Sequence, residues 1–366
     1  MVRRHGRAMR AIVGCLIALG CQCALAQAGR GATAVDTVAE KKAAESPWLL
    51  LPTFSVSPKL GTSLGAMAGY LHYFDEKSPV SMLVASLQYT STDSIVAGLF
   101  GKAAFGGDQH RVTAGILGGN IKNDYDDFLG TGQPLKSEDQ LRAIFGRYLY
   151  RVAGDWFGGA QAININYATY GLNPIDEQAL NALGLVGFKS VGAGLVAYHD
   201  SRDLEASPSR GWMLNLNNVA YREGLGSQQD YDVYRGDFRA FWSHGEGHVL
   251  ALRQNNQLTH DAPASASSSV SLRGYKQGQY LGKNMSSLEL EERYRFAEKW
   301  TATLFGGFAC LYGDGRSCSD RENLYPSGGF GVQYALKRRE GIVLNLEYGA
   351  GKDGSYGVYL KMGYAY

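Results

Sequence analysis

Apolar residues alternate with polar or small ones along most of the chain, from Trp48 to Tyr366. In one segment Ile163, Ile165 and Tyr167 alternate with asparagines. Successive side chains of a strand point to opposite faces, so each such segment has one apolar and one polar face. The pattern predicts an all-β protein with about 16 strands, and we place them at residues 47–56, 62–74, 79–90, 93–105, 109–119, 139–152, 155–168, 187–199, 211–222, 230–243, 246–258, 285–296, 299–311, 326–338, 341–350 and 355–366.

The connections between the predicted strands differ in length on the two sides of the sheet. If the first strand rises from the periplasm, four of the outside connections are long: 120–138, 169–186, 259–284 and 312–325. Most periplasmic connections are tight, such as His244-Gly245, and the exception is 200–210. Long loops on one side and short turns on the other are typical of outer-membrane barrels. By this count 259–284 is the sixth extracellular loop.

Charged residues in mid-strand favour a membrane barrel over the alternative, a secreted β-sandwich. Arg235, Asp237 and Arg239 share one face of the strand at 230–243. A sandwich core would pay several kcal/mol of desolvation for each of them, whereas a water-filled barrel lumen accommodates charge. No apolar stretch after the N-terminal segment reaches the roughly 20 residues of a membrane helix. We therefore predict a transmembrane antiparallel β-barrel.

The N-terminus has the pattern of an export signal. Four arginines precede an apolar run from Ala11 to Leu19, and Ala24-Leu25-Ala26 provides small residues for signal peptidase. A membrane anchor, one alternative, needs a longer run, and a lipoprotein site at Cys21 fits poorly. We expect a signal peptide at 1–26, a flexible periplasmic segment at 27–46 and a barrel domain at 47–366. The location we expect is the outer membrane of a Gram-negative bacterium, in contact with lipid and lipopolysaccharide.

Composition narrows the classes of function. The 366-residue chain has a net charge of +2 and no basic cluster with interleaved aromatic residues, which argues against a nucleic-acid partner. No Cys/His spacing indicates a metal, and we expect no cofactor. The sequence neighbours His199, Asp200 and Ser201 do not form a triad, because neighbours in a strand point apart. We therefore expect no enzyme activity.

Three of the five cysteines fall within the expected signal peptide, which leaves Cys310 and Cys318. Two cysteines this close in sequence suit a small loop disulfide in an oxidising compartment. Two free thiols are the alternative.

The last predicted strand ends in aromatic residues. One of its faces carries Tyr356, Val358, Leu360, Met362, Tyr364 and Tyr366. Aromatic girdles mark the ends of barrel strands at the membrane interfaces. The final Tyr364 and Tyr366 also resemble the signal by which the barrel-insertion machinery selects its substrates. The alternative is a merely amphipathic last strand.

Two motifs resemble the barrel domain of the bacterial surface antigen family, the outer-membrane assembly superfamily that includes BamA, TamA and the two-partner secretion transporters. The first comprises Asp200, Arg202 and Asp203, followed by Pro208 and Gly211. It is similar to the family's aspartate–x–arginine–aspartate turn, and it falls in the long periplasmic connection. Asp200 and Asp203 can flank Arg202 and cap turn amides. An ordinary charged turn is the alternative.

The second motif is Leu272-Arg273-Gly274-Tyr275, followed by Gly278, Gly282 and Asn284. It resembles the family's arginine–glycine–aromatic tip, which folds back into the lumen from the sixth extracellular loop. The resemblance implies that Arg273 pairs with acidic residues of the inner wall. Alternation points Glu289 and Glu291 of the next strand to the lumen, and Glu291 matches the family's position. The alternative is an exposed loop arginine.

One position departs from the family pattern. Gly307 stands where the family has an aspartate, and Ala309 stands where it has a glycine. We expect Arg273 to lose one partner and the loop to be held more loosely.

The resemblance implies a role in inserting or translocating polypeptides at the outer membrane. The barrel would open between its first strand (47–56) and last strand (355–366), and a substrate polypeptide would pair with that edge. The expected partners are this substrate and, during biogenesis, the barrel-insertion machinery. Residues 27–46 are too few for the family's periplasmic POTRA domains, so the resemblance covers the barrel alone. The alternative is a passive pore or a structural surface-antigen barrel.

Overall fold

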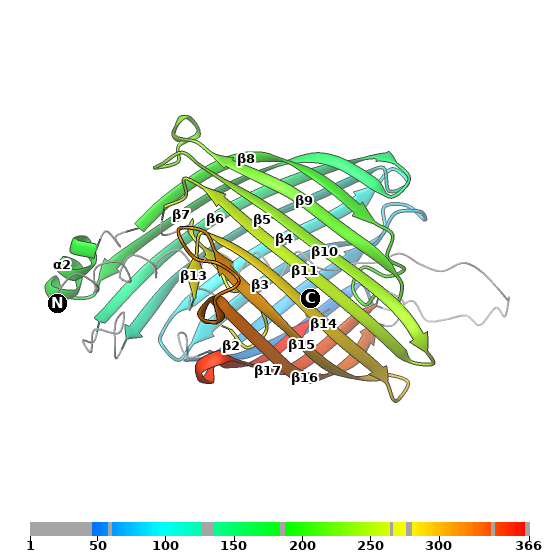
Figure 1. The fold of residues 1–366 in the computed structure, drawn as a ribbon. Coiled ribbons are helices and arrows are strands. Elements are labelled where there is room, and N and C mark those ends of the chain that lie inside the picture. The colour runs from blue at the N-terminus through cyan, green and yellow to red at the C-terminus, as the bar shows by residue number, and fades with distance from the viewer. Residues whose placement is uncertain are drawn as a thin grey trace.

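The computed structural model describes residues 46–57, 61–125, 135–183, 187–263, 266–275, 280–337 and 341–362. Within them, sixteen antiparallel strands form a closed barrel (Figure 1). The strands are β1 (Trp48–Ser57), β2 (Gly61–His72), β3 (Ser81–Thr90), β4 (Ile95–Phe105), β5 (His110–Tyr125), β6 (Leu135–Ala153), β7 (Trp156–Gly171), β8 (Gly187–Asp200), β9 (Gly211–Tyr221), β10 (Tyr231–Gly245), β11 (His248–His260), β14 (Asn284–Arg295), β15 (Trp300–Tyr312), β16 (Leu324–Lys337), β17 (Ile342–Gly351) and β18 (Tyr356–Met362). The predicted fold class and strand number are confirmed.

Each wall strand pairs with its sequence neighbour except at two places. Between β11 and β14 the chain leaves the wall and forms the small ladder of β12 (Ser268–Ser269) and β13 (Leu281–Gly282). The barrel then closes where β1 meets β18, and the described register there joins Ser55 to Tyr359 and Val56 to Val358. We call this β1–β18 contact the seam.

The outer face of the wall is apolar in mid-strand. Leu195 and Leu304 are 71% and 67% exposed, and Ile116 and Ile144 lie side by side as partners across β5 and β6. Trp300 is exposed at the periplasmic end of β15, where it packs against Tyr334. An outward apolar band with aromatic residues at its rim is the surface of a barrel that lies in lipid.

The extracellular hairpin of β5 and β6 is longer than predicted. The sequence prediction ended the first strand at residue 119, whereas the ladder continues from Asn120 paired with Gln140 to Tyr125 paired with Leu135. The continuation is mostly polar in sequence, with Lys122 and Asn123 among its residues, but Ile121, Ser137 and Asp139 in it are buried. Because the buried face carries polar residues as well as Ile121, the alternation of apolar and polar residues is too weak there to predict the strand.

The extracellular connection after β7 contains a helix that the alternation pattern did not predict, α2 (Pro174–Leu183). Asn173 caps it, because its Oδ1 accepts the backbone N–H groups of Ile175 at 3.0 Å and Asp176 at 2.9 Å. Leu180 is its buried apolar anchor. None of the helices in the described part of the chain is long and apolar enough to cross a bilayer.

Some sequence predictions lie outside the described residues. These are the signal peptide at 1–26, the following segment up to residue 45, Gly278, and the terminal Tyr364 and Tyr366.

Candidate functional site

Between β11 and β14, residues such as Val270 and Arg273 are buried against the inner wall of the barrel, and we call the described residues of this connection, 261–263, 266–275 and 280–283, the lumen loop. Val270 and Tyr275 of the loop are buried in one cluster with Ala309, Leu311 and Tyr325 of β15 and β16. Val270 is 1% exposed and Leu311 is fully buried. The apolar cluster therefore holds the loop against the extracellular ends of β15 and β16.

Arg273 of the lumen loop lies among carboxylates of the wall. Its Nη1 is 2.6 Å from Glu291 Oε2, and its Nη2 is 2.8 Å from Glu289 Oε1. The structure thus brings together the predicted residues Arg273, Glu289 and Glu291, all at most 6% exposed. Charge-assisted hydrogen bonds of this geometry are roughly twice as strong as neutral ones. We propose that this cluster locks the loop in the lumen.

A third carboxylate, which the motif comparison missed, completes the cluster. Glu347 of β17 is 1% exposed, and its Oε1 accepts from Arg273 Nη1 at 3.1 Å. The Arg273 guanidinium also stacks on the ring of Phe305, 3.4 Å from the ring centroid. Glu347 supplies from β17 the negative charge that Gly307 of β15 lacks. The expected loss of one partner therefore does not leave Arg273 short of carboxylates.

Gly274 lets the loop backbone lie directly on the wall. Its φ of 95° is in the left-handed region, and a Cβ there would lie 2.7 Å from the carbonyl carbon of Ala350. Its N–H donates to Tyr359 Oη at 2.9 Å, and its carbonyl accepts from Ser355 Oγ at 2.7 Å. The loop tip is therefore attached to β18, the last strand of the barrel, and to the residue that precedes it.

Tyr275 extends the attachment to the neighbouring strands. Its hydroxyl donates to the carbonyl of Pro326 at 2.6 Å and accepts the N–H of Lys352 at 2.7 Å. A Cβ at Gly351 would lie 2.4 Å from the Tyr275 ring, so the glycine makes room for it. Leu272, the remaining predicted residue of this motif, packs against the edge of the apolar cluster.

The periplasmic turn, residues 201–210, is organised by the predicted aspartates and arginine. Arg202 binds Asp200 with two nitrogens, at 2.7 and 3.1 Å. Burial alone would lower the pKa of Arg202, but the Asp200 carboxylate outweighs it and the pKa lies above its usual value. Asp203 Oδ1 accepts the N–H groups of Leu204 at 2.9 Å and Ser209 at 2.8 Å. The turn closes at Gly211, whose φ is 93°.

The turn folds into the barrel instead of hanging below it. Glu205 forms an ion pair with Lys102 of β4, and both side chains are 9% exposed. Asp200 is 3.4 Å from Arg111 of β5. On the far side of the turn, Ser243 of β10 donates to the carbonyl of Ser209 at 3.1 Å. The turn therefore reaches several wall strands at the periplasmic mouth. Pairs such as Lys102–Glu205 join distant segments, so the local motif gave no sign of them.

Arg293 of β14 connects the two motifs. Its Nε donates to Glu291 Oε1 at 3.0 Å, and its Nη1 donates to the carbonyl of Pro208 at 2.7 Å. Pro208 is fully buried in the turn. Because Glu291 also binds Arg273, a continuous series of hydrogen bonds runs from the lumen loop through the wall to the periplasmic turn.

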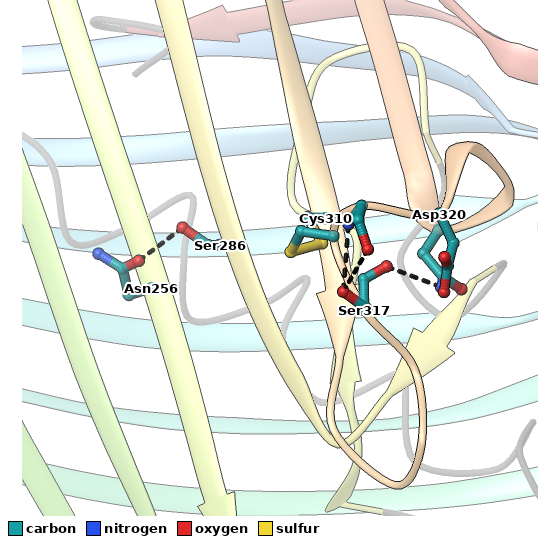
Figure 2. Close-up of a disulfide and its surroundings, with 8 residues drawn as sticks. Asn256, Ser286, Cys310, Ser317 and Asp320 are labelled. Atoms are coloured by element: carbon teal, nitrogen blue, oxygen red, sulfur yellow. Dashed lines mark hydrogen bonds between the residues drawn. A yellow bond between two sulfur atoms is a disulfide. The ribbon is translucent and has the colours of Figure 1, made fainter.

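The structure joins Cys310 and Cys318 by a disulfide, with 5.7 Å between their Cα atoms. Figure 2 shows Cys310 on β15 beside Ser317 and Asp320 of the following loop. In that loop Asn323 Nδ2 donates to the carbonyl of Ser317 at 3.0 Å. The disulfide thus fastens the start of an extracellular loop next to the apolar cluster that contains Cys310's neighbours Ala309 and Leu311.

These features define a transmembrane barrel of the outer-membrane type, with a loop folded into its lumen and a turn folded into its periplasmic mouth. Solved structures of similar fold include BamA from Haemophilus ducreyi lacking POTRA domains 1–3, with a TM-score of 0.57 and 13% identity over 87% of this chain and 69% of that one. CdiB from Acinetobacter baumannii (TM-score 0.59, 11% identity, 86% of this chain) and CdiB from Escherichia coli (0.58, 11%, 88%) are also similar. The chain covers 59% and 63% of the two CdiB chains.

No family model matches the sequence, and no curated protein matches it. The likeness to BamA and CdiB is therefore one of fold. It confirms the barrel architecture to which the two motifs pointed, and with the apolar outer band it makes this chain an outer-membrane barrel.

Replacing Arg273 with alanine tests the lock. The Arg273→Ala variant leaves three buried carboxylates without their shared cation, so we expect the free energy of unfolding to fall by about 3–5 kcal/mol. We also expect conductance in planar bilayers to rise as the loop leaves the lumen. Arg295→Ala, at the exposed periplasmic end of β14, is the matched control. Unchanged stability and unchanged conductance would refute the lock.

Replacing Arg293 with glutamine tests the connection to the periplasmic turn. Loss of the hydrogen bond to Pro208 should loosen residues 201–210, so trypsin should cut after Arg202 or Arg210 several times faster than in the wild type. Limited proteolysis of the folded barrel, followed by mass spectrometry, measures this rate. Arg295→Ala again serves as control. Equal cleavage rates in Arg293→Gln and the wild type would show that the turn is held without Arg293.

Proposed function

We propose that this barrel assists the insertion or translocation of polypeptides at the outer membrane, and that it does so by opening at the seam. The observation that carries the proposal is the contrast between the two edges of β18. Its edge toward β17 is paired from Tyr356 with Ala350 to Met362 with Leu344. Its described pairing with β1 consists of Ser55 with Tyr359 and Val56 with Val358.

Among the pairings of the described residues the seam is the shortest ladder of the wall, and we infer that it separates at the lowest cost. Each backbone hydrogen bond contributes about 0.5–1.5 kcal/mol net, and β1 keeps its full ladder with β2 from Trp48 to Ser57 when the seam opens. Separation leaves two strand edges with free N–H and C=O groups. Such edges pair with an incoming extended segment, which is how a substrate polypeptide would engage the barrel.

The lumen loop supports this division of the barrel. Its tip binds Tyr359 of β18 and Glu347 of β17, and both strands lie on the C-terminal side of the seam. During opening, the loop would move with that side and keep β14 to β18 together. In addition to stabilising the barrel, the lock would therefore keep the edge of β18 rigid for pairing with the substrate.

The partners we propose are a substrate polypeptide, the lipid and lipopolysaccharide around the barrel, and the insertion machinery that places the barrel in the membrane. The likeness to the BamA and CdiB barrels supports an assembly or transport role without enzyme chemistry. In this proposal the barrel acts on the substrate polypeptide only by binding it and by pairing with it at a strand edge.

A passive pore is the second candidate, and one feature favours it. The inner wall of β6, β10 and β11 carries the half-buried arginines Arg147, Arg235, Arg239 and Arg253. Asp237 binds two of them, Arg239 at 2.5 Å and Arg253 at 3.1 Å. A basic wall of this kind would suit anionic solutes. The lumen loop and the periplasmic turn both lie inside the barrel, however, and they narrow any such path.

A cross-link across the seam tests the assembly role. Val56 and Val358 are register partners across the seam, at a separation that suits a disulfide. The variant therefore carries Val56→Cys together with Val358→Cys. In cells depleted of the native protein, we expect at least one outer-membrane or secreted protein to decrease. The wild type should restore it, and the cross-linked variant should restore it only after reduction. Quantitative proteomics of the outer membrane and the medium measures the outcome.

The matched control is the pair Leu50→Cys and Ala68→Cys, which joins β1 to β2 and leaves the seam free. It should restore the missing protein with or without reductant, which separates the effect of the seam from that of the native disulfide. A proteome that depletion leaves unchanged, together with altered uptake of small anions, would overturn the assembly role in favour of the pore.

A further inference from the structure

Three potential metal ligands, which belong to neither motif, meet at the periplasmic rim. His244 Nε2 lies 2.9 Å from Glu292 Oε2, and His248 Nδ1 lies 2.9 Å from Glu292 Oε1. The ligand atoms of the three residues all lie within 4.8 Å of one another. Their side chains are 51%, 40% and 34% exposed, respectively, so solvent reaches the cluster.

The hairpin between β10 and β11 creates this arrangement. His244 and His248 stand on either side of its tight turn, and Gly247 has a φ of 76°. The turn is fastened to β14, because Arg295 donates its N–H to the carbonyl of Gly247 at 2.8 Å. Glu292 pairs in register with Leu250, two residues beyond His248, so it shares the outward face with both.

The site is held in place on its own strands. Tyr294 stacks on the imidazole of His248, with ring centroids 4.6 Å apart, and this contact restricts the orientation of the ring. The two imidazole rings lie 5.4 Å apart. Trp242 is exposed two residues before His244, so the cluster lies beside the aromatic rim of the outer face.

From this geometry we propose that His244, His248 and Glu292 bind a divalent first-row transition metal such as Zn²⁺. Two imidazoles and one carboxylate form a known three-ligand zinc set, which leaves the remaining position to water. With bonds of about 2.0–2.2 Å, the ligands of a tetrahedral site lie about 3.3 Å apart. The nitrogens here are 2.9 to 3.2 Å from the Glu292 oxygens and within 4.8 Å of each other, so small rotations of the side chains would bring all three ligands to an ion.

The spacing of residues in the sequence does not reveal this cluster. The two histidines are four residues apart, but Glu292 follows His248 by 44 residues. Only the pairing of β11 with β14 brings the carboxylate to them. A bound metal would tie β10, β11 and β14 together at the periplasmic rim, just below the wall that holds the lumen loop.

Zinc titration of the folded full chain, carrying no polyhistidine tag, tests the site. Calorimetry in detergent should show one Zn²⁺ per chain. His248→Ala and Glu292→Gln should each weaken the affinity by about tenfold or more, because even loss of an outer-shell partner costs that much. His260→Ala is the matched control: His260 pairs with Asp261 at 3.1 Å at the extracellular end of β11 and should leave the affinity unchanged.

A second measurement needs no substitution. Zn²⁺ should protect His244 and His248 of the wild type from modification by diethyl pyrocarbonate and should leave His260 reactive. Zinc affinity in His248→Ala equal to that of the wild type would overturn the proposal, as would equal modification of His244 and His248 with and without Zn²⁺. Either result would leave the cluster as an ion pair alone.

Discussion

The burial of one arginine among three carboxylates determines how the inside of this barrel is arranged. Glu289, Glu291 and Glu347 point from the wall into a space where water barely reaches them, and Arg273 is the cation they share. Carboxylates in such surroundings are costly unless they are paired. The carboxylates of the wall therefore determine where the loop lies, and Arg273 of the loop offsets the cost of burying them. The gain is a defined loop position more than a large net stability.

The same cluster extends in two directions. Toward the periplasm, Glu291 shares Arg293 with the carbonyl of Pro208, so the turn at the mouth and the loop at the tip belong to one network. Toward the seam, Gly274 is bound to Tyr359 of β18. A barrel that opens between β1 and β18 would carry the loop with its C-terminal strands. Hydrogen bonds thus connect the lumen loop to both the periplasmic turn and the last strand at the seam.

Much of the architecture could be read from the chain, because the two-residue period of a strand is visible wherever one face meets lipid and the other meets water. The period is lost where the buried face is itself polar, as at Ser137 and Asp139 in the extended hairpin of β5 and β6. Local motifs identified Arg273 and Glu291. They could not identify Glu347, which lies 74 residues from Arg273, because only closure of the barrel brings β17 beside the loop. The cluster around Glu292 was missed for the same reason.

A double-mutant cycle between Arg273 and Glu291 measures the interaction on which this account rests. The free energy of unfolding in urea would be compared for the wild type, Arg273→Ala, Glu291→Gln and the double variant. The account predicts a coupling energy of about 1–3 kcal/mol, with the double variant less destabilised than the sum of the single ones. Single effects that add to within about 0.5 kcal/mol would mean that the two residues act independently, and would contradict the lock.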